Sequence, residues 1–554
     1  MGIDLMNIEQ LIQALTLEEK ASLLSGQDFW HTRAIPRLGI PAIMMTDGPH
    51  GLRKEAGSSG AGLSNNIPAT CFPTAACLAS SWDRGLLAEV GSAIAEEALE
   101  EKVSVVLGPG ANIKRSPLCG RNFEYFSEDP YLSGEMARCW IEGAQRRGVG
   151  ASLKHFAANN QETRRLTIDA VLDERALREI YLRGFEIAVR GAQPWTVMAA
   201  YNRLNGNYCA EHPGLLEDIL RGEWGFTGLV VSDWGAANER AAGLRAGLDL
   251  EMPGVSNGND ELIITAVRAG KLDEQALNRS VRRVLELAAR AQKALEKDVI
   301  YDRDAHHALA RRAAAEGAVL LKNENHLLPL NKDQKIALIG GFAKNPRYQG
   351  SGSSSMNPTR LDTLFGELVK LMGEERLSFA PGYELGDDQP HAGLIEEAVR
   401  AARKAGTAVI CAGLPEMDEV EGLDRECLRL PDAHIALIEA AEQEMREREI
   451  GPDRFFFAHR GGRNASGALA SALDGRETAG SSHAYWSDPE PQSTLIDEVE
   501  PYLLRSELIV RSPRGRRLTS AGLEREYIID IPENYDKDKP CRLIFTMHMI
   551  GGSM

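Results

Sequence analysis

The sequence lacks the marks of several classes of protein. It contains no run of about 18 apolar residues, so no transmembrane helix and no membrane partner are expected. Its first residues form neither a basic segment nor an apolar one, so no signal peptide is predicted and we expect a cytoplasmic protein. The 8 cysteines include no C-x-x-C pair, which argues against a zinc ribbon.

Positive charge is also scarce. The chain has 63 Lys and Arg against 80 Asp and Glu, which gives a formal net charge of −17. A dedicated nucleic-acid-binding protein needs a basic face to neutralise phosphates, so nucleic acid is not an expected partner. Internal repeats and long low-complexity tracts are absent as well. Because 43% of the residues are hydrophobic, a disordered or fibrous protein is excluded.

The first half of the chain has the pattern of an α/β barrel. Strand-like apolar runs alternate with segments of helical period up to about residue 290. The strand-like runs are 42–46, 103–108, 150–155, 195–201, 228–234 and 248–253, and the helical segments are 83–97, 132–145, 173–190 and 212–221. We therefore predict a (β/α)8 TIM-like barrel over residues 1–290. A doubly wound sheet is the alternative, but no glycine-rich dinucleotide fingerprint follows the first strand.

A second α/β unit is predicted after a linker at 291–316. Residues 317–444 read as a truncated, partial α/β sandwich with buried parallel strands at 317–323, 335–340 and 405–413 and a helix at 394–404. Residues 445–493 are rich in Gly, Ala, Ser and charge and have weak periodicity, so we expect a low-order linker there. Residues 494–525 and 526–554 complete the chain as a composite tail.

Polar residues follow several of the predicted barrel strands. Asp47 follows the first, Lys154 and His155 end another, and Asp233 and Trp234 end a later one. The carboxyl ends of barrel strands meet at one mouth, where catalytic groups come from several strands. Carboxylates, a cation, a histidine and aromatic rings at one mouth suit a neutral, polyhydroxylated substrate. The alternative for any single residue is a hydrogen-bonded structural role.

These stretches resemble glycoside hydrolase family 3, of the β-glucosidase type. The resemblance covers about residues 10–440, in order and with matching spacing. It rests on 46–53 (TDGPHGLR), 108–113 (GPGANI), 120–130 (GRNFEYFSEDP), 154–163 (KHFAANNQET), 198–202 (MAAYN), 230–235 (VVSDWG), 348–354 (YQGSGSS) and 421–425 (EGLDR). The resemblance implies a barrel that carries the nucleophile and a sandwich domain that supplies the acid/base.

The resemblance also implies the catalytic pair. Asp233 matches the nucleophile, which forms a glycosyl-enzyme intermediate, and Glu421 matches the general acid/base. Glu419 and Glu416 are rivals for the acid/base role because they lie on the same loop. A retaining mechanism predicts carboxyl groups about 5–5.5 Å apart. It implies no metal and no organic cofactor.

Further residues are implied for the terminal sugar. Asp47 would bind hydroxyls at its far end, which makes the enzyme exo-acting. The other implied substrate-binding residues are Arg121, Lys154, His155, Arg165, Met198, Tyr201, Trp234 and Ser353. Tyr201 would orient the Asp233 carboxylate, Trp234 and Met198 would shape the pocket, and Arg53 would support the site from behind.

The tail carries two short resemblances. Residues 494–525, through 500–503 (EPYL) and 511–516 (RSPRGR), resemble the winged helix of bacterial Holliday-junction branch-migration helicases. Residues 526–554, through 526–532 (EYIIDIP), resemble the start of a feruloyl-esterase-like α/β-hydrolase. No Gly-x-Ser-x-Gly nucleophile elbow follows, so esterase activity is not expected.

The leading hypothesis is a retaining exo-β-glucosidase. It would release terminal non-reducing β-D-glucosyl residues from small β-glucosides or oligosaccharides, in carbohydrate and cellulose degradation. β-Xylosidase and α-L-arabinofuranosidase activities are alternatives that the family resemblance also admits. A catalytically weak sugar-binding protein is another, because the second domain is truncated. Nucleic-acid binding through the basic run 505–517 is disfavoured by the acidic balance of the chain.

Overall fold

The computed structural model describes residues 7–57, 65–254, 259–296, 298–320, 328–447, 455–459, 509–512, 515–520 and 523–524. The chain divides into two units, Met1–Arg476 with Met547–Met554 and Glu477–Thr546. In the second unit, the described strands β15 (Ile509–Ser512), β16 (Gly515–Ser520) and β17 (Leu523–Glu524) form an antiparallel sheet. All that follows concerns the first unit. The esterase-like piece at 526–554 lies outside the described residues.

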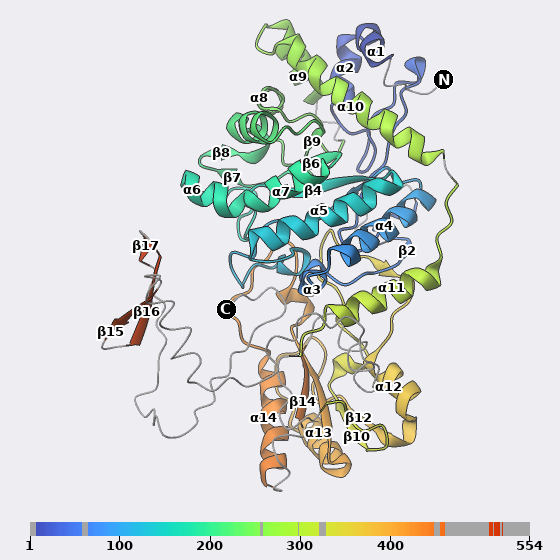
Figure 1. Cartoon of the computed structure of the whole chain (residues 1–554), viewed down its shortest axis with the longest axis vertical. Coiled ribbons are helices and arrows are strands. Elements are labelled where there is room, and N and C mark those ends of the chain that lie inside the picture. The colour runs from blue at the N-terminus through green and yellow to red at the C-terminus, as the bar shows by residue number, and fades with distance from the viewer. Residues whose placement is uncertain are drawn as a thin grey trace. The chain divides into compact units, whose positions relative to one another are not determined.

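A curled parallel sheet forms the centre of the first half of the chain (Figure 1). Its strands are β1 (Met45–Asp47), β3 (Val105–Leu107), β4 (Gly150–Phe156), β6 (Thr196–Ala199) and β9 (Leu229–Ser232), in that spatial order. Every pair is parallel, and neighbours in space follow one another along the chain, which is the order of a barrel. The TIM-like fold predicted from the sequence is therefore confirmed.

The predicted run 248–253 forms no strand of its own. It contributes parallel bridges, Leu250 with Val231 and Glu251 with Ser25. These two bridges extend the curled sheet beyond β9. The described residues thus form five named barrel strands and two bridged segments, fewer than the eight strands that the sequence pattern predicts.

Helices surround this sheet, and several of them begin at a capping residue. Asp83 caps α4 through the amides of Gly85 and Leu86, and Thr16 with Glu19 forms the capping box of α2. The helices are α1 (Ile8–Ala14), α2 (Leu17–Leu23), α3 (Ala75–Ser80), α4 (Arg84–Glu100), α5 (Pro130–Arg147), α6 (Glu174–Ala176), α7 (Arg183–Ala192), α8 (Arg240–Ala246), α9 (Asn259–Arg268) and α10 (Glu274–Leu295). Apolar faces of α4, α5 and α7 pack against the outside of the sheet in one buried core.

Shorter elements fill the connections. The 3-10 and π-helical turns are η2 (Pro36–Leu38), η3 (Asn122–Glu124), η4 (Leu177–Tyr181), η5 (Cys209–Glu211) and η6 (Gly214–Glu223). A small sheet joins β5 (Asp169–Ala170), β7 (Arg203–Leu204) and β8 (Asn207–Tyr208). The predicted helix at 173–190 is thus divided among α6, η4 and α7, and the one at 212–221 is the π-helical η6.

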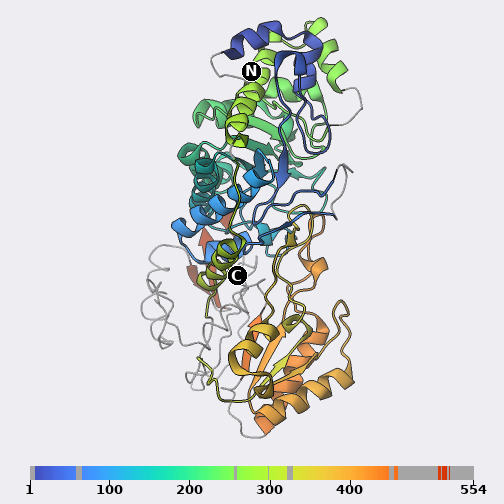
Figure 2. The same cartoon turned by 90° about the vertical axis from the view of Figure 1, so that its right-hand side faces the viewer.

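The second domain is a parallel sheet with helices on both faces (Figure 2). Its strands are β10 (Ile336–Ile339), β12 (Leu377–Ala380), β13 (Ala408–Ala412) and β14 (Phe455–His459), in the order β12-β10-β13-β14. Ile336 and Leu338 pack with α12 (Leu364–Met372), whereas Ala337 and Ile339 pack with α13 (Ala392–Ala405) and α14 (Asp432–Glu447). β10 and β13 are buried on both faces, which explains their unbroken apolar runs.

Three features of this domain differ from the prediction. Strand β12 was not expected, and β14 lies within the stretch 445–493 for which the sequence predicts low order. The predicted strand at 317–323 begins with residues 317–320, which have no regular structure, and its remainder lies outside the described residues. The further turns of this domain are η8 (Gly341–Ala343), η9 (Glu374–Arg376) and η10 (Glu416–Asp418).

Helix α11 (Arg303–Glu316) joins the two domains within the predicted linker 291–316. His306 contacts Glu96 and Glu97 of α4, at 3.1 and 2.8 Å. The neighbouring His307 contacts Asp362 of the second domain at 2.9 Å. A parallel pair, β2 (Pro68–Ala69) with β11 (Asn357–Pro358), also connects the domains.

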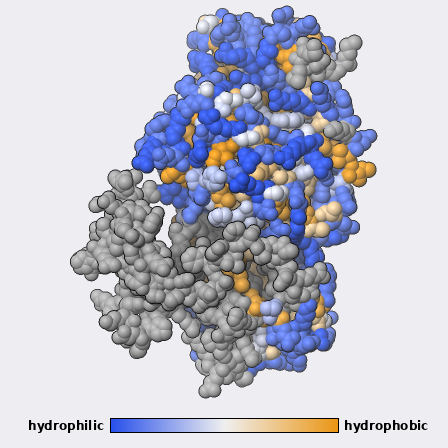
Figure 3. Space-filling view, in the orientation of Figure 1, coloured by the Kyte–Doolittle hydropathy of each residue, from blue (hydrophilic) through white to orange (hydrophobic). Residues whose placement is uncertain are grey.

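The exposed face of the barrel is mostly hydrophilic, with small separate apolar patches (Figure 3). Within the described residues, no helix combines the length and the apolar character needed to cross a membrane.

Candidate active site

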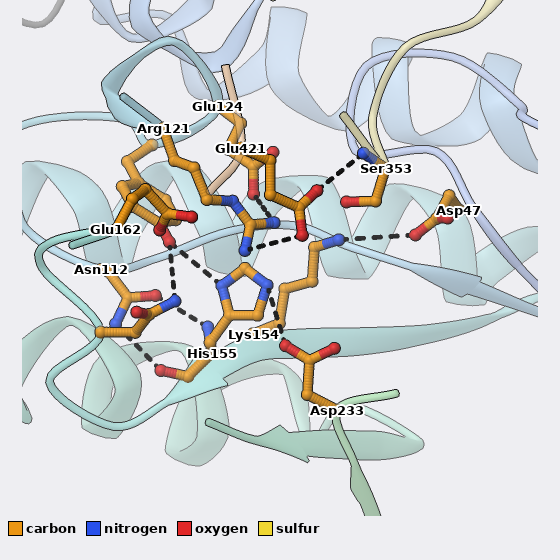
Figure 4. A network of polar contacts seen from close by, with 12 residues as sticks. Asp47, Asn112, Arg121, Glu124, Lys154, His155, Glu162, Asp233, Ser353 and Glu421 are labelled. Atoms are coloured by element: carbon orange, nitrogen blue, oxygen red, sulfur yellow. Dashed lines mark hydrogen bonds and ion pairs between the residues drawn. The ribbon is translucent and has the colours of Figure 1, made fainter. Parts of the chain in front are cut away.

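The strand-end residues singled out in the sequence meet in one buried polar network (Figure 4). Asp47 is the last residue of β1, Lys154 and His155 lie in β4, and Asp233 directly follows β9. These four side chains are nearly inaccessible to solvent, since their residues are at most 8% exposed. Burying several charges together requires that they pair with one another, so their mutual contacts define the site.

Asp233 is held with one oxygen bound and the other turned to the network. Its Oδ1 accepts the main-chain N–H of Trp234 at 2.8 Å. Its Oδ2 has no hydrogen bond to any described residue and lies 3.7 Å from Nε2 of His155. Burial raises the pKa of the Asp233 carboxyl above its ordinary value, although the charge of Arg121 opposes this.

His155 is fixed from both its ring and its backbone. The ring Nδ1 lies 3.1 Å from the hydroxyl of Tyr125. Asn112 accepts the main-chain N–H of His155 at 2.8 Å and donates to its carbonyl at 2.9 Å. Burial holds the pKa of His155 well below its ordinary value, and the charges of Arg121 and Lys154 lower it further. The imidazole is therefore neutral at pH 7, suited to hydrogen bonding rather than ion pairing.

Asp47 lies between two cations. Arg53 donates to its Oδ2 at 2.8 Å, and Nζ of Lys154 lies 3.7 Å from its Oδ1. Burial raises the pKa of Asp47, against the opposing charges of Lys154 and Arg53. Arg53 also donates to the carbonyl of Ser353 at 3.2 Å, so it links the barrel to the second-domain loop. Arg53 thus touches Asp47 itself, as expected for a supporting residue.

Glu421 reaches the network from the second domain (Figure 4). Its Oε1 accepts from Arg165 at 2.7 Å and lies 3.7 Å from Nη1 of Arg121. Its Oε2 accepts the main-chain N–H of Ser353 at 2.7 Å. Burial alone would raise the pKa of Glu421, but the charges of Arg121 and Arg165 outweigh burial and hold this pKa well below its ordinary value.

The two rival glutamates are engaged elsewhere. Glu419 is buried and its Oε2 lies 3.7 Å from Nη2 of Arg347. Glu416 is exposed and accepts a hydrogen bond from the hydroxyl of Ser351. Glu421, by contrast, contacts Arg121 and Arg165 of the network.

The remaining predicted residues lie around the network with varied contacts. The Tyr201 hydroxyl donates to the carbonyl of Trp234 at 2.9 Å rather than to the Asp233 carboxylate, contrary to the expected role of Tyr201. Trp234 donates its indole N–H to the carbonyl of Phe29 at 2.8 Å and packs against Trp30, 5.8 Å between ring centroids. Its ring is therefore held in one orientation beside Asp233.

Met198 has a different environment from the polar residues. It is 2% exposed and packs in the barrel core around Val231 and Leu250. None of its described contacts is polar, so its role in shaping a pocket stays a prediction.

Several functional-looking residues were missed in the sequence. Glu124 pairs with Arg121 at 2.6 Å, and Glu162 binds Arg165 at 2.9 Å and the N–H of Gly422 at 2.8 Å. Asp424 accepts main-chain N–H groups of the barrel. All three lie inside the motif stretches quoted above. The sequence did contain a signal for these three residues, because acidic side chains within otherwise buried motifs need ionic or hydrogen-bonding partners.

A cluster of metal-ligating groups lies elsewhere in the described residues. Glu384, Asp387 and His391 come close enough together to share an ion, on the second domain and outside this network. Exposed acidic groups of this kind are common without a metal, so the cluster does not bear on the chemistry of the site.

Family models account for most of the described chain. Residues 7–287 match the glycosyl hydrolase family 3 N terminal domain, and residues 318–448 match the glycosyl hydrolase family 3 C-terminal domain. The chain belongs to glycosyl hydrolase family 3. Residues 488–525 also match the RuvB C-terminal winged helix domain, in agreement with the short resemblance found in the tail.

Relatives within the family carry more than one activity in their names. The chain is 56% identical over 440 residues to thermostable beta-glucosidase B of Acetivibrio thermocellus, covering 79% of this chain and 58% of that protein. It is 50% identical over 444 residues to an exo-alpha-(1->6)-L-arabinopyranosidase of Bifidobacterium longum, covering 77% and 58%. The chain thus spans 58% of the length of these curated relatives.

Solved structures agree with the fold. The Bifidobacterium adolescentis GH3 beta-glucosidase superposes with a TM-score of 0.77 at 44% identity, covering 83% of this chain and 68% of that one. Beta-glucosidase 3B from Thermotoga neapolitana in complex with glucose gives a TM-score of 0.75 at 36% identity, covering 85% and 74%.

Proposed function

We propose that the protein is a retaining, exo-acting β-glucosidase that hydrolyses terminal non-reducing β-D-glucosyl residues. The observation that carries the proposal is the meeting of Asp233 and Glu421. The two carboxylates come from different domains, and the same arginine, Arg121, influences the pKa of both. One carboxyl has an oxygen without a hydrogen bond and the other is ion-paired, which gives the two acids distinct environments.

In the first step, Oδ2 of Asp233 attacks the anomeric carbon. A bond forms between them while the bond from that carbon to the leaving oxygen breaks, and Glu421 gives its proton to that oxygen. Because Arg165 and Arg121 hold the pKa of Glu421 low, only a small fraction of Glu421 carries a proton at neutral pH. We therefore expect this step to depend strongly on the leaving group.

In the second step, the ion-paired form of Glu421 is the useful one. As a carboxylate it takes a proton from a water molecule, whose oxygen attacks the anomeric carbon and releases Asp233. The product keeps the β configuration because two displacements occur at the same carbon. The lowered pKa of Glu421 keeps it in the carboxylate form that this step requires.

Asp47 and Lys154 support the exo-acting part of the proposal. Together with Arg53, they form a buried charged group. Carboxylate and ammonium groups make charge-assisted hydrogen bonds to hydroxyls, so they suit the end of a sugar that is not bonded to a further residue. The glucose complex of the Thermotoga neapolitana neighbour supports a glucosyl unit as the ligand.

Glu421 is the proposed acid/base rather than Glu419 or Glu416. The contacts of Glu421 with Arg165 and Ser353 support this choice. Glu419 is paired with Arg347, and Glu416 is exposed.

A second candidate substrate is a terminal α-L-arabinopyranoside. Two relatives are named for that specificity, and this chain covers 58% of each of them, as it does of the β-glucosidase relative. Arabinopyranose is a six-membered sugar ring without the hydroxymethyl group of glucose, so both sugars could present comparable ring hydroxyls to Asp47 and Lys154. β-Xylosidase and α-L-arabinofuranosidase activities are less favoured alternatives.

The deciding experiment compares the parent with Asp233→Ala. Release of p-nitrophenol from the β-D-glucoside, the β-D-xyloside and the α-L-arabinopyranoside is measured for both. We expect the parent to prefer the glucoside and Asp233→Ala to be slower by about 10³-fold or more. Azide should restore turnover of the variant and give the α-glucosyl azide, because the anion enters from the face that Asp233 occupied.

The control is Asp333→Ala, which removes an exposed aspartate outside the network. It should leave the rate unchanged. Equal rates for the parent and Asp233→Ala would contradict the nucleophile assignment, and a parent that releases nothing would contradict the glycosidase proposal.

A further inference from the structure

We propose that Asp424 is a positioning residue that docks the Glu421 loop onto the barrel and so sets the place of the acid/base relative to Asp233. The inference rests on the proposed function, because it concerns how Glu421 is held for proton transfer. Asp424 is three residues from Glu421 and makes no contact with Asp233 or Asp47 in the structure. Its effect on chemistry would therefore be indirect.

The Asp424 carboxylate accepts main-chain N–H groups from two separate barrel loops. Oδ1 accepts from Gly120 at 3.2 Å and from Glu162 at 2.9 Å, and Oδ2 accepts from Thr163 at 2.8 Å. Hydrogen bonds to an ionised acceptor are stronger than those between neutral groups. One second-domain side chain therefore ties together two barrel loops that are not neighbours along the chain.

The backbone around Asp424 lies directly on the barrel. A Cβ atom at Gly120 would overlap the carbonyl oxygens of Leu423 and Val420. In addition, Arg425 donates its main-chain N–H to the carbonyl of Leu118 at 2.8 Å. The loop has no room to settle closer, so its position is determined by contact with the barrel rather than by the second domain alone.

The two loops that Asp424 binds also supply the charges around Glu421. Arg121 directly follows Gly120, and its Nη1 lies 3.7 Å from Oε1 of Glu421. Arg165 bridges Glu162 and Glu421, at 2.9 and 2.7 Å. Because the same segments hold both Asp424 and the two arginines, a loss of the Asp424 contacts would move Glu421 relative to its own cations and to Asp233.

Contacts on the other side of the loop stay within the second domain. The N–H of Glu421 donates to the carbonyl of Ser351 at 3.1 Å. The N–H of Ser351 donates to the carbonyl of Glu419 at 3.0 Å. These bonds shape the loop but do not fasten it to the barrel. The hydrogen bonds of Asp424, the bond from the Gly422 N–H to Glu162 and the bond from the Arg425 N–H to Leu118 do so.

The experiment measures leaving-group dependence in Asp424→Ala and Asp424→Asn. Two substrates are compared: phenyl β-D-glucoside, whose leaving oxygen needs a proton, and 2,4-dinitrophenyl β-D-glucoside, whose leaving oxygen does not. For Asp424→Ala we expect kcat/KM on the phenyl glucoside to fall by about 10²-fold, since a displacement of about 1 Å is enough for that loss. The fall on the dinitrophenyl glucoside should be less than a tenth as large.

The conservative variant and a matched control complete the design. Asp424→Asn keeps one acceptor oxygen and should recover part of the loss. Glu426→Ala removes an exposed carboxylate two residues further along the same loop and should match the parent. Equal falls on both substrates in Asp424→Ala, or no fall, would overturn the positioning role.

Hydrogen exchange tests the contact without relying on activity. The amides of Gly120, Glu162 and Thr163 should exchange faster in Asp424→Ala than in the parent or in Glu426→Ala. Unchanged exchange would overturn the inference. If the parent hydrolysed neither substrate, the proposed function would fail by itself, and faster exchange confined to Asp424→Ala would still support Asp424 as the docking contact.

Discussion

At the scale of single residues, two opposing effects act on the pKa of Glu421. Burial favours its neutral, proton-donating form, whereas Arg121 and Arg165 favour its charged, proton-accepting form. The arginines outweigh burial in the structure. The proposed acid/base Glu421 therefore depends on these two cations for its protonation state as well as for its position.

We expect Glu421→Gln to be far more damaging than Glu419→Gln. General acid–base groups contribute about 10²- to 10⁴-fold to rates, so kcat/KM of Glu421→Gln on phenyl β-D-glucoside should fall within that range. Glu419→Gln should lose less than about tenfold, because its carboxylate pairs with Arg347 and not with the arginines that hold Glu421. The opposite order would transfer the acid/base role to Glu419.

Sequence reasoning located the strand-end residues but not their partners. Asp47, Lys154 and His155 could be predicted to meet because the ends of parallel strands converge. Glu162 could have been matched to Arg165, three residues away on the same loop, but not to Gly422, since the Gly422 contact depends on how two loops from different domains pack. Motif and spacing alone also could not separate Glu421 from Glu419, which share a loop.

At the scale of elements, helix α11 connects the domains through adjacent histidines that face opposite ways. His306 is bound between Glu96 and Glu97 of α4 and stacks on Tyr301, 4.8 Å between ring centroids. Glu97 in turn accepts the N–H of Thr70, next to the strand that pairs with β11. A substitution of His306 is therefore expected to affect both attachments between the domains, helix α11 and the β2–β11 pair.

We expect His306→Gln to lower stability more in mild acid than in alkali. Burial lowers the pKa of His306, but its hydrogen bonds and charge contacts with Glu97 and Glu96 outweigh burial and raise this pKa above its ordinary value. A raised pKa in the folded state means that the stabilisation is complete below the unfolded pKa of about 6.5, and is lost as pH rises through the folded value.

Unfolding free energies at pH 6 and pH 9 measure this effect. The variant should lose about 1–3 kcal/mol at the lower pH, the usual penalty for leaving a buried partner unsatisfied, and less at the higher one. His391→Gln is the control, because its pair with Asp387 lies at the surface. An equal loss at both pH values would show that charge is not involved.

Element prediction succeeded where apolar runs were unbroken and failed where they were interrupted or misleading. β10 and β13 are fully buried and read as continuous apolar runs. β12 has the same length as β10, four residues, but its two central residues are partly exposed, so no such run marks it. In the segment 317–320, the apolar residues Val319 and Leu320 are 47% and 60% exposed. These apolar residues therefore lie at the surface and do not belong to a buried strand.

At the scale of the whole molecule, negative charge dominates. The net charge of −17 and the sequence pI of about 5.3 describe a chain that repels polyanions at neutral pH. The short match to a winged helix at 488–525 does not alter that balance. The domain boundaries predicted from the sequence, 1–290 and 317–444, stay predictions, although the family models match 7–287 and 318–448.

We expect the full chain to pass through a double-stranded DNA column without retention, even at low salt. Phosphate binding requires clustered cations whose effect exceeds the overall repulsion. A basic DNA-binding protein run on the same column is the positive control. Retention that is released steadily as salt increases would contradict this expectation and assign a binding role to the basic run 505–517.

Asp233 and Glu421 come from separate domains, and this affects the order in which the site is assembled during folding. Arg165 and Glu421, which are in direct contact, are 256 residues apart in the chain. Contacts of such long sequence separation form late, because a large loop must be closed before they can be made. Each domain can therefore acquire its core before Glu421 and Arg165 come into contact. Compactness alone would then not mark a completed site, because the proposed catalytic pair is assembled only when the domains meet.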